Sequence, residues 1–244
     1  MFGGIVLYLM GACSFWSEPQ ITIEVTDIWG TPVVAVVSVI NQEKQTNESG
    51  KLEIAEKQLY SEEITIQEFT VKAPEYMRAK VSHTHLLADA STARITIQLY
   101  PELKREGVYL VGEQAYVPIS ETLSREISSD LDVFVGFETN HETHVQEGDE
   151  LLLYLPQHES FEVHQLRSLE KQSIKIDNTI QEHDFQLHVL GSLVQPPRLP
   201  LAQKNVFRIH ISKELNDGDY ALHQKTTHLQ DAQPAFIFQK GRHP

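Results

Sequence analysis

Apolar and polar residues alternate along the first hundred positions with the period of a β-strand. Residues 21–25, 64–71 and 93–99 show this alternation, and residues 33–40 form an almost unbroken run of apolar, mostly β-branched side chains. Strand side chains point alternately to two faces, so alternation predicts strands buried on one face and the apolar run predicts a fully buried one. No segment has the period of a helix, and the pattern predicts a β-sandwich over residues 20–101.

Turn-forming residues separate these segments. Residues 26–32 combine Gly and Pro, which is typical of a tight turn, and residues 41–50 form a polar stretch that ends on Gly50. We expect the polar stretch to be a hairpin connection, with residues 51–55 as the return strand.

The second half of the chain predicts ten more short strands beyond residues 101–107, a charged, Pro-containing break suited to a linker. These strands are 108–112, 115–119, 131–137, 150–155, 161–166, 173–177, 184–190, 206–211, 220–223 and 235–238. Residues 120–130 predict a short helix or a polar loop, and the Pro-rich residues 191–205 predict an ordered surface loop. Residues 207–223 resemble the final hairpin of many Ig-like sandwiches, so we expect an Ig-like β-sandwich over 106–242.

The start of the chain is apolar in a different way. Residues 5–12 form a short uncharged run that ends before the only cysteine, Cys13. A helix needs roughly 20 apolar residues to span a bilayer, so this run predicts no membrane span, although it has the length of the apolar core of a secretory signal.

The residues Met10, Gly11 and Ala12, followed by Cys13, resemble a bacterial lipobox. The resemblance implies a signal peptide over residues 1–12, cleavage after Ala12 and lipid attachment to the thiol of Cys13. Residues 13–19 would then form a tether to the first sandwich. The alternative interpretation is a first β-strand in which Cys13 is an ordinary small buried residue.

A lipid on Cys13 would determine where the protein works. Two or more acyl chains hold a protein stably at a membrane, whereas one chain does so only marginally. We therefore expect a lipid-anchored protein of the bacterial cell envelope, at the outer membrane or facing the periplasm, with the membrane as its first partner.

Composition narrows the remaining functions. The net charge of −14 argues against a nucleic-acid partner, because neutralising phosphates requires Lys and Arg. A single cysteine excludes both an internal disulfide framework and a zinc site built from several thiolates. If that cysteine carries lipid, no cysteine nucleophile remains.

Three groups of residues in the first half share the spacing of a known family. They are Asp27, Gly30 and Pro32 followed by Ala35; Thr46, Asn47, Gly50 and Lys51; and Ala73, Pro74 and Tyr76. In this pattern residues 20–101 resemble a carboxypeptidase regulatory-like domain, which is a transthyretin-like β-sandwich. Glu75 stands where the family usually has Gly, a residue that supplies φ > 0 at that turn. Such domains are usually non-catalytic, so the resemblance implies a binding or structural role.

Histidine pairs are the main candidates for a metal site. His83 and His85 would share one face of a strand, and His141 and His144 would share one face of a helix. A catalytic zinc site needs three protein ligands, and residues 141–144 do not complete the His-Glu-x-x-His pattern. These four histidines are therefore weak candidates, and the sequence predicts no metal site.

Other motifs of catalysis are missing. The segments 147–150 and 216–220 resemble hairpin turns more closely than calcium loops, and no nucleophile elbow or phosphate-binding glycine loop is present. The sequence thus predicts no cofactor and no catalytic residue. We expect a non-enzymatic envelope protein that binds a protein or glycan partner through its sandwiches. The alternatives are a carbohydrate-binding module and a metal- or carboxylate-dependent envelope hydrolase.

Overall fold

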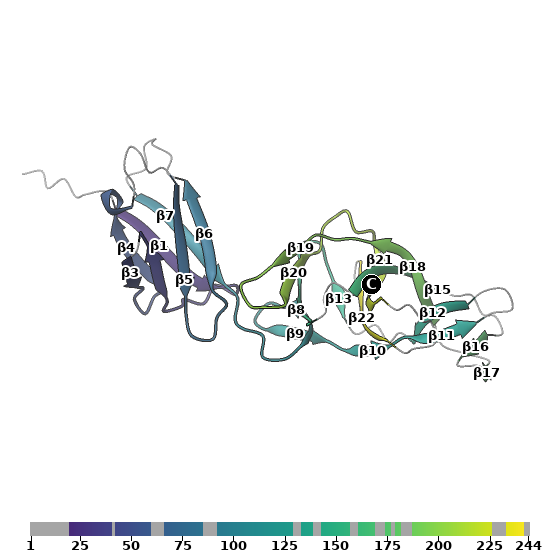
Figure 1. Ribbon diagram of the computed structural model, residues 1–244. Coiled ribbons are helices and arrows are strands. Elements are labelled where there is room, and N and C mark those ends of the chain that lie inside the picture. Colours follow the sequence, from purple (N-terminus) through teal and green to yellow (C-terminus); the bar gives the residue numbers. More distant parts are fainter. Residues whose placement is uncertain are drawn as a thin grey trace, which may run out of the picture. The chain divides into compact units, whose positions relative to one another are not determined.

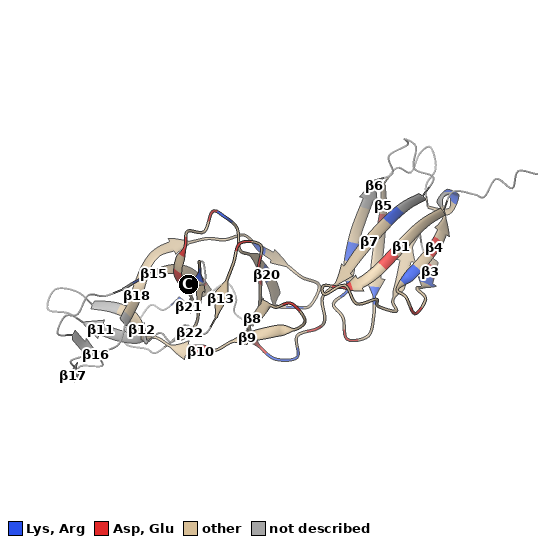
Figure 2. Cartoon of the chain, turned by 180° about the vertical axis from the view of Figure 1, so that it is seen from behind, with Lys and Arg blue, Asp and Glu red and all other residues tan. Residues whose placement is uncertain are grey.

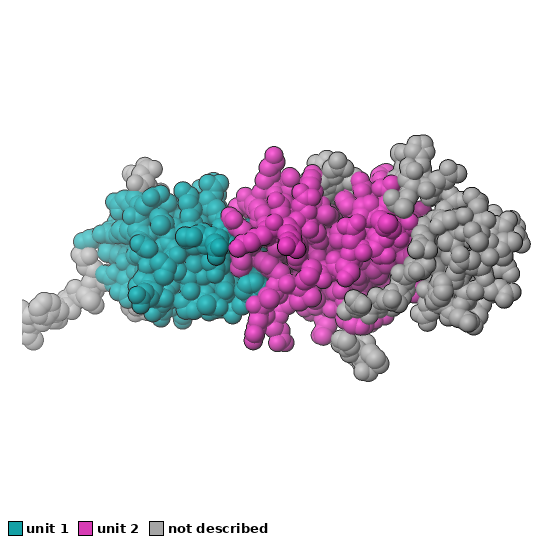
Figure 3. Space-filling model, turned by 90° about the horizontal axis from the view of Figure 1, so that it is seen from below, with its two compact units in different colours: residues 1–100 teal, residues 101–244 magenta. Residues whose placement is uncertain are grey.

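The computed structural model divides into two compact units, residues 1–100 and residues 101–244, coloured separately in Figure 3. It describes residues 20–40, 42–59, 66–84, 92–128, 133–138, 143–156, 161–168, 174–176, 179–181, 187–225 and 233–241. The prediction of an all-β fold is confirmed, because every described element except the 3-10 turn Glu56–Gln58 is a strand (Figure 1). The described residues contain no helix of the length and apolarity that a membrane span requires. The predicted signal peptide, tether and lipidation site lie outside the described residues.

Unit 1 consists of two small sheets. The first has the order β4–β1–β7, from Lys51–Ala55, Gln20–Asp27 and Thr92–Leu99. The second has the order β3–β2–β5–β6, from Gln42–Gln45, Val36–Val39, Ile66–Lys72 and Ala79–Thr84. β1 pairs in parallel with β7, and parallel neighbours cannot be joined by a hairpin. Between them the chain forms β2 and β3 of the second sheet, returns to the first sheet as β4, and then completes the second sheet with β5 and β6.

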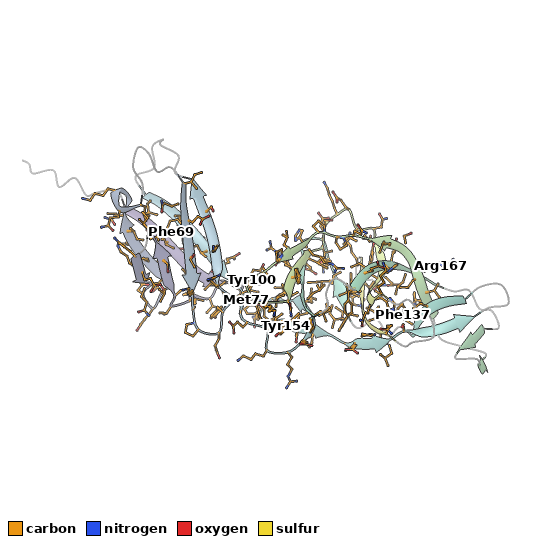
Figure 4. The ribbon with its side chains drawn as sticks, viewed as in Figure 1. Phe69, Met77, Tyr100, Phe137, Tyr154 and Arg167 are labelled. Carbon is orange, nitrogen blue, oxygen red and sulfur yellow. The ribbon has the colours of Figure 1, made fainter. Side chains whose placement is uncertain are left out.

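The core of unit 1 lies between these sheets and follows the alternation in the sequence. Ile21, Ile23 and Val25 of β1 are buried, as are Phe69 and Val71 of β5, and all belong to one apolar cluster. The Phe69 side chain points into this interior in Figure 4. The opposite face of the first sheet is polar: Lys51 and Arg94 both contact the carboxylate of Glu24, and Figure 2 shows both signs of charge on these strands.

The turn after β1 is held by its own side chains. The carboxylate of Asp27, itself 5% exposed, accepts hydrogen bonds from the N–H groups of Trp29 (2.9 Å) and Thr31 (2.8 Å). Gly30 has φ = 85°, a conformation that glycine adopts without steric cost. The Asp and Gly of this segment are therefore required by the turn geometry.

A second polar contact, made by Thr46, joins the residue after β3 to the segment before β2. The buried hydroxyl of Thr46 accepts a hydrogen bond from the N–H of Ala35 (2.9 Å) and donates one to the carbonyl of Val33 (3.1 Å). Gly50 follows with φ = 70°, and a Cβ there would lie 2.3 Å from the carbonyl oxygen of Val25. Only glycine fits between this turn and β1.

Unit 2 also contains two sheets. The smaller has the order β19–β20–β14–β8–β9, from Arg198–Pro200, Val206–His210, Glu150–Tyr154, Gly107–Val111 and Tyr116–Ile119. The larger has the order β10–β22–β21–β15–β18–β12–β11–β16–β17, with β13 (His144–Val145) beside β22. Its other strands are Glu121–Leu123, Pro234–Lys240, Gly218–Gln224, Phe161–Ser168, Leu187–Val194, Val133–Glu138, Arg125–Ser128, Ile174–Ile176 and Thr179–Gln181.

The core of unit 2 lies between the smaller sheet and one face of the larger. Leu151 and Leu153 of β14 pack with Val163, Tyr220 and Phe238 in one buried cluster. The rings of Tyr220 and Phe238 are stacked, with centroids 5.5 Å apart and an interplanar angle of 13°. Burial of these side chains is the main source of stability of this unit.

Two predictions for the second half are wrong. Where the structure describes the segment predicted as a helix or loop, it forms β10 over residues 121–123 and β11 over residues 125–128. The expected surface loop at 191–205 contains the end of β18 and the edge strand β19, where a proline is tolerated because one side of the strand needs no donor. Both segments pair with apolar strands, and that pairing outweighs their weak local preference.

Two boundaries in the first half also differ from prediction. Only Val36–Val39 of the apolar run is a strand, because Pro32 pairs with Thr26 and holds the start of the run in an irregular path. The predicted polar connection contains the strand Gln42–Gln45, whose side chains are almost all exposed. This strand has no apolar pattern because it lies at the edge of its sheet.

Candidate functional site

The clearest site lies at one end of unit 2 and is lined by residues of both its sheets. A cleft of about 260 Å³ opens between the starts of β8, β10, β15 and β22 and the ends of β14 and β21. We call it the end cleft and define it by residues Glu106, Glu121, Leu155, Phe161, Gln224 and Phe236.

The floor of the end cleft is apolar and well packed. Leu155, Phe161 and Phe236 are 7%, 6% and 3% exposed, and the two rings lie with centroids 6.3 Å apart at an interplanar angle of 42°. Phe161 lies opposite Gln224 in the sheet, and Phe236 lies opposite Glu121. Residues directly opposite each other share a face, so the polar groups of Gln224 and Glu121 stand on the same face as the rings.

Hydrogen bonds fix both sides of the cleft. The guanidinium of Arg198 donates to the carbonyl of Phe161 (2.5 Å). The N–H of Ser124 donates to the carbonyl of Gln233 (2.9 Å), and the N–H of Gln233 donates back to the Ser124 hydroxyl (3.0 Å). β10 and β22 are thereby clamped just beside the cleft, which makes the site largely preformed.

On the other side of the cleft, the segment before β8 is also held by hydrogen bonds. The amide side chain of Gln203 accepts from the N–H of Leu103 (3.0 Å) and donates to the carbonyl of the same residue (2.9 Å). Leu103 is buried, so residues 101–106 pack onto unit 2 as part of its fold.

Two carboxylates form the charged part of the rim. Glu106 and Glu121 are exposed, and within the described part of the chain neither has an ion pair or a hydrogen-bonded side chain. Gly107 follows Glu106 and presents no side chain to the opening. The end cleft therefore combines a fixed apolar floor with uncompensated negative charge, which suits binding of a group that is apolar along its length and cationic or hydrogen-bond donating at its end.

The opposite face of the larger sheet carries a row of ionisable side chains. The carboxylate of Glu162 lies 3.4 Å from His164 Nε2 and 3.2 Å from Lys225 Nζ. Burial raises the pKa of the Glu162 carboxyl, but the hydrogen bonds from Lys225 and His164 outweigh it and leave the pKa below its usual range. His223 lies directly opposite Glu162 on β21.

His223 is the most constrained member of this row. It is 3% exposed, and its ring meets the Phe137 ring edge-on with centroids 5.6 Å apart. Burial, with a smaller contribution from His164, lowers the pKa of His223 to about 4, although Glu162 acts in the opposite direction. His223 Nε2 and His164 Nδ1 are buried without a hydrogen-bond partner among the described residues.

These imidazoles do not assemble into a metal centre. The described residues contain no group of three or more His, Cys, Asp or Glu side chains that could hold a metal ion. Of the predicted candidates, His83 lies on β6 and His144 lies half-buried on the short strand β13, in different units. His85 and His141 lie outside the described residues, as do Met10, Gly11, Ala12 and Cys13 of the predicted lipobox.

Sequence reasoning did not single out the end cleft or the row formed by Glu162, His164 and His223. Period-two alternation within two of the predicted strands could have placed Glu162 and His164 on one face. The pairing of β15 with β21, which brings His223 beside them, depends on strand order and register. Comparison of the chain with protein-family models finds no match, and no curated protein matches it.

Proposed function

We propose that this chain is a non-catalytic binding protein of the bacterial cell envelope, held at a membrane by lipid on Cys13. In this proposal it binds its partner through the end cleft of unit 2. The observation that carries the proposal is the cleft itself, an open and preformed site with an apolar floor and a few polar groups at the rim. Such a combination is typical of binding sites.

Sequence features support the envelope part of the proposal. The lipobox-like residues 10–13 and the resemblance of residues 20–101 to a carboxypeptidase regulatory-like domain both favour a secreted, anchored protein. The turn contacts of Asp27, Thr46 and Gly50 give physical roles to the residues on which the resemblance rests. Unit 1 would then serve as a rigid support that carries unit 2.

Metabolic labelling tests the anchor. Cells grown with radiolabelled palmitate should incorporate label into the protein, and the protein should sediment with membranes. Cys13→Ala should abolish the label and release the chain from the membrane fraction, because no other residue of the chain is a cysteine. A native protein that carries no label, or a Cys13→Ala variant that stays labelled, would contradict the lipid anchor.

A comparison of variants tests the binding site. Gln224→Trp places a bulky ring at the cleft, whereas Gln146→Trp makes the same change on an exposed turn of the same unit. Proteins captured from a detergent-solubilised envelope should bind the Gln146→Trp chain and be lost from the Gln224→Trp chain. Capture of the same set by both variants would remove the cleft from the proposal.

A carboxylate-dependent glycan hydrolase is the second candidate, favoured by one observation: Glu106 and Glu121 both line the end cleft. Glycoside hydrolysis requires two carboxyl groups on either side of the scissile bond. This function predicts release of reducing ends from purified peptidoglycan, abolished by either Glu106→Gln or Glu121→Gln. The binding proposal predicts no release by the native chain.

A further inference from the structure

We propose that the end cleft of unit 2 receives a lysine or arginine side chain of a partner protein. The alkyl stem would lie on the floor formed by Leu155, Phe161 and Phe236, and the cationic head would lie at the rim with Glu106 and Glu121. This inference rests on the proposed binding function and names the group that the cleft recognises.

The size of the site favours one inserted side chain. Pockets for drug-sized ligands and cofactors span about 300–1,000 Å³. The end cleft holds about 260 Å³ and is open to one side, so it is too small to enclose such a ligand. A single long side chain projecting from another protein requires less space than a whole ligand.

The cleft is apolar at its floor and negatively charged at its rim. A basic side chain has a matching order, with an apolar stem followed by a positively charged head. Lysine and arginine place an apolar stem of three or four methylene groups before the charge. The buried rings of Phe161 and Phe236 and the side chain of Leu155 match the stem. The faces of aromatic rings carry partial negative charge and attract a cation within about 6 Å of the ring centre.

The rim supplies the matching charge. Glu106 and Glu121 are exposed and have no cationic partner among the described residues, so an incoming ammonium or guanidinium group would not have to displace one. The amide of Gln224 adds an acceptor on the same face. A net charge of −14 over the whole chain also favours encounter with a basic partner.

The two prolines that line the cleft favour insertion of a side chain over addition of a strand. Pro156 follows β14 and Pro234 begins β22, and proline has no N–H to donate. Pro234 is already paired with Leu123 of β10, so β22 offers no free edge at the cleft for an added peptide strand. Recognition must therefore come from the side chain that enters the cleft.

Peptide titration of the full chain in detergent tests the proposal. The probes are acetylated, amidated pentapeptides with Gly-Ser flanks and a central lysine, arginine, norleucine or glutamate. Backbone amide signals of Glu121, Gln224 and Phe236 should move with the lysine and arginine peptides. Norleucine retains the stem without the charge and should bind at least fivefold more weakly, and raising the salt concentration should weaken the basic peptides as well.

Charge-matched variants localise the effect. The double variant Glu106→Gln/Glu121→Gln should weaken lysine-peptide binding at least fivefold, as loss of two exposed charge contacts predicts. Glu147→Gln/Glu214→Gln removes the same charge from exposed positions of unit 2 outside the cleft and should bind like the native chain. All four positions are exposed, so both variants should retain the native spectrum.

Three results of the titrations would overturn the inference. They are equal binding of the norleucine and lysine peptides, equal weakening by the two double variants, and signal changes from chitotetraose at the cleft with none from the basic peptides. Envelope proteins captured equally well by both double variants would also overturn it, while leaving the proposed envelope-binding function intact. A chain that carries no lipid and captures nothing would instead contradict the proposed function.

Discussion

The two units differ in how completely their buried polar groups are hydrogen-bonded. In unit 1 the buried carboxylate of Asp27 and hydroxyl of Thr46 each make two hydrogen bonds with nearby backbone groups, and these contacts define the turns. In unit 2 the buried imidazole of His223 and the half-buried imidazole of His164 each keep a buried ring nitrogen without a partner among the described residues. A satisfied buried group stabilises its unit, whereas an unsatisfied one costs about 1–3 kcal/mol.

The difference indicates how the two units could divide their work. Unit 1 builds a fixed frame from locally satisfied turns. Unit 2 retains polar groups that destabilise it and places a preformed cleft at one end. This contrast agrees with the proposed roles of a support and a binding unit. A series of substitutions, ordered by the size of the expected effect, tests it.

The largest effect should come from adding a side chain at Gly50, where two backbone segments of unit 1 lie in close contact. Gly50→Ala would place its Cβ 2.3 Å from a backbone carbonyl oxygen at φ = 70°, so it should destabilise unit 1 by about 3 kcal/mol or more. Gly30→Ala has a similar φ of 85° but open space around the Cβ, and it should cost only about 1–2 kcal/mol. Both tryptophans, Trp16 and Trp29, precede residue 101, so urea unfolding followed by tryptophan fluorescence reports on unit 1. Equal effects of the two substitutions would contradict the close contact.

Acid should weaken unit 2 by a comparable amount through His223. Its folded pKa of about 4 lies below the unfolded value of 6.5, so the unfolded chain binds more protons between these pH values. Stability from this group is complete above pH 6.5 and falls as the pH drops to 4, by about 3 kcal/mol in total at 1.36 kcal/mol per pKa unit. Urea unfolding at pH 7 and pH 4, followed through NMR signals of unit 2, measures the loss. His223→Leu should remove most of it, and an equally acid-sensitive variant would contradict the assignment.

The third prediction gives opposite outcomes for the two kinds of buried polar group. Thr46→Val leaves the N–H of Ala35 and the carbonyl of Val33 without partners, so it should destabilise unit 1 by about 2 kcal/mol. At pH 7, His223→Leu removes an unsatisfied nitrogen and should change the stability of unit 2 by less than about 1 kcal/mol or raise it. Destabilisation of the same size in both units would remove the contrast between them.

The smallest effect concerns backbone strain in unit 1. Glu75 has φ = 66°, a left-handed conformation that glycine adopts without steric cost. Glu75→Gly should therefore stabilise unit 1 by about 1 kcal/mol, as relief of left-handed strain predicts. The control Glu53→Gly lies within β4 and should destabilise by a similar amount, because glycine weakens a strand interior. Denaturant unfolding by tryptophan fluorescence compares the two, and a loss of stability in Glu75→Gly would contradict the account.

Local features of the fold were predictable from the sequence, and long-range ones were not. The alternation in residues 21–25 and 93–99 predicted which side chains of β1 and β7 are buried, because one-sided burial leaves a period of two. The strands β10 and β11 were missed because residues 120–130 are polar and acquire their conformation from pairing with β22 and β12. Short, mostly polar strands such as these are specified by their neighbours more than by their own residues.

The candidate site shows the same limit. Phe161 and Gln224 are 63 positions apart, and Glu121 and Phe236 are 115 apart, yet each pair is directly opposite in the sheet. No local sequence pattern predicts such neighbours, because strand order and register must be known first. The sequence singled out His83, His85, His141 and His144 because of the close spacing within each pair. The two that the structure describes, His83 and His144, come from different pairs and lie in different units.

Site-specific photo-crosslinking in living cells tests the central claim most directly, which is that unit 2 binds the partner at its end cleft. Benzoylphenylalanine would replace Leu123, which is exposed on β10 opposite the cleft residue Pro234, and, as the control, Glu53 on the exposed side of β4 in unit 1. The account predicts a discrete crosslinked envelope protein from position 123, lost on adding Glu106→Gln/Glu121→Gln, and none from position 53. Crosslinks from position 53 with none from position 123 would contradict it.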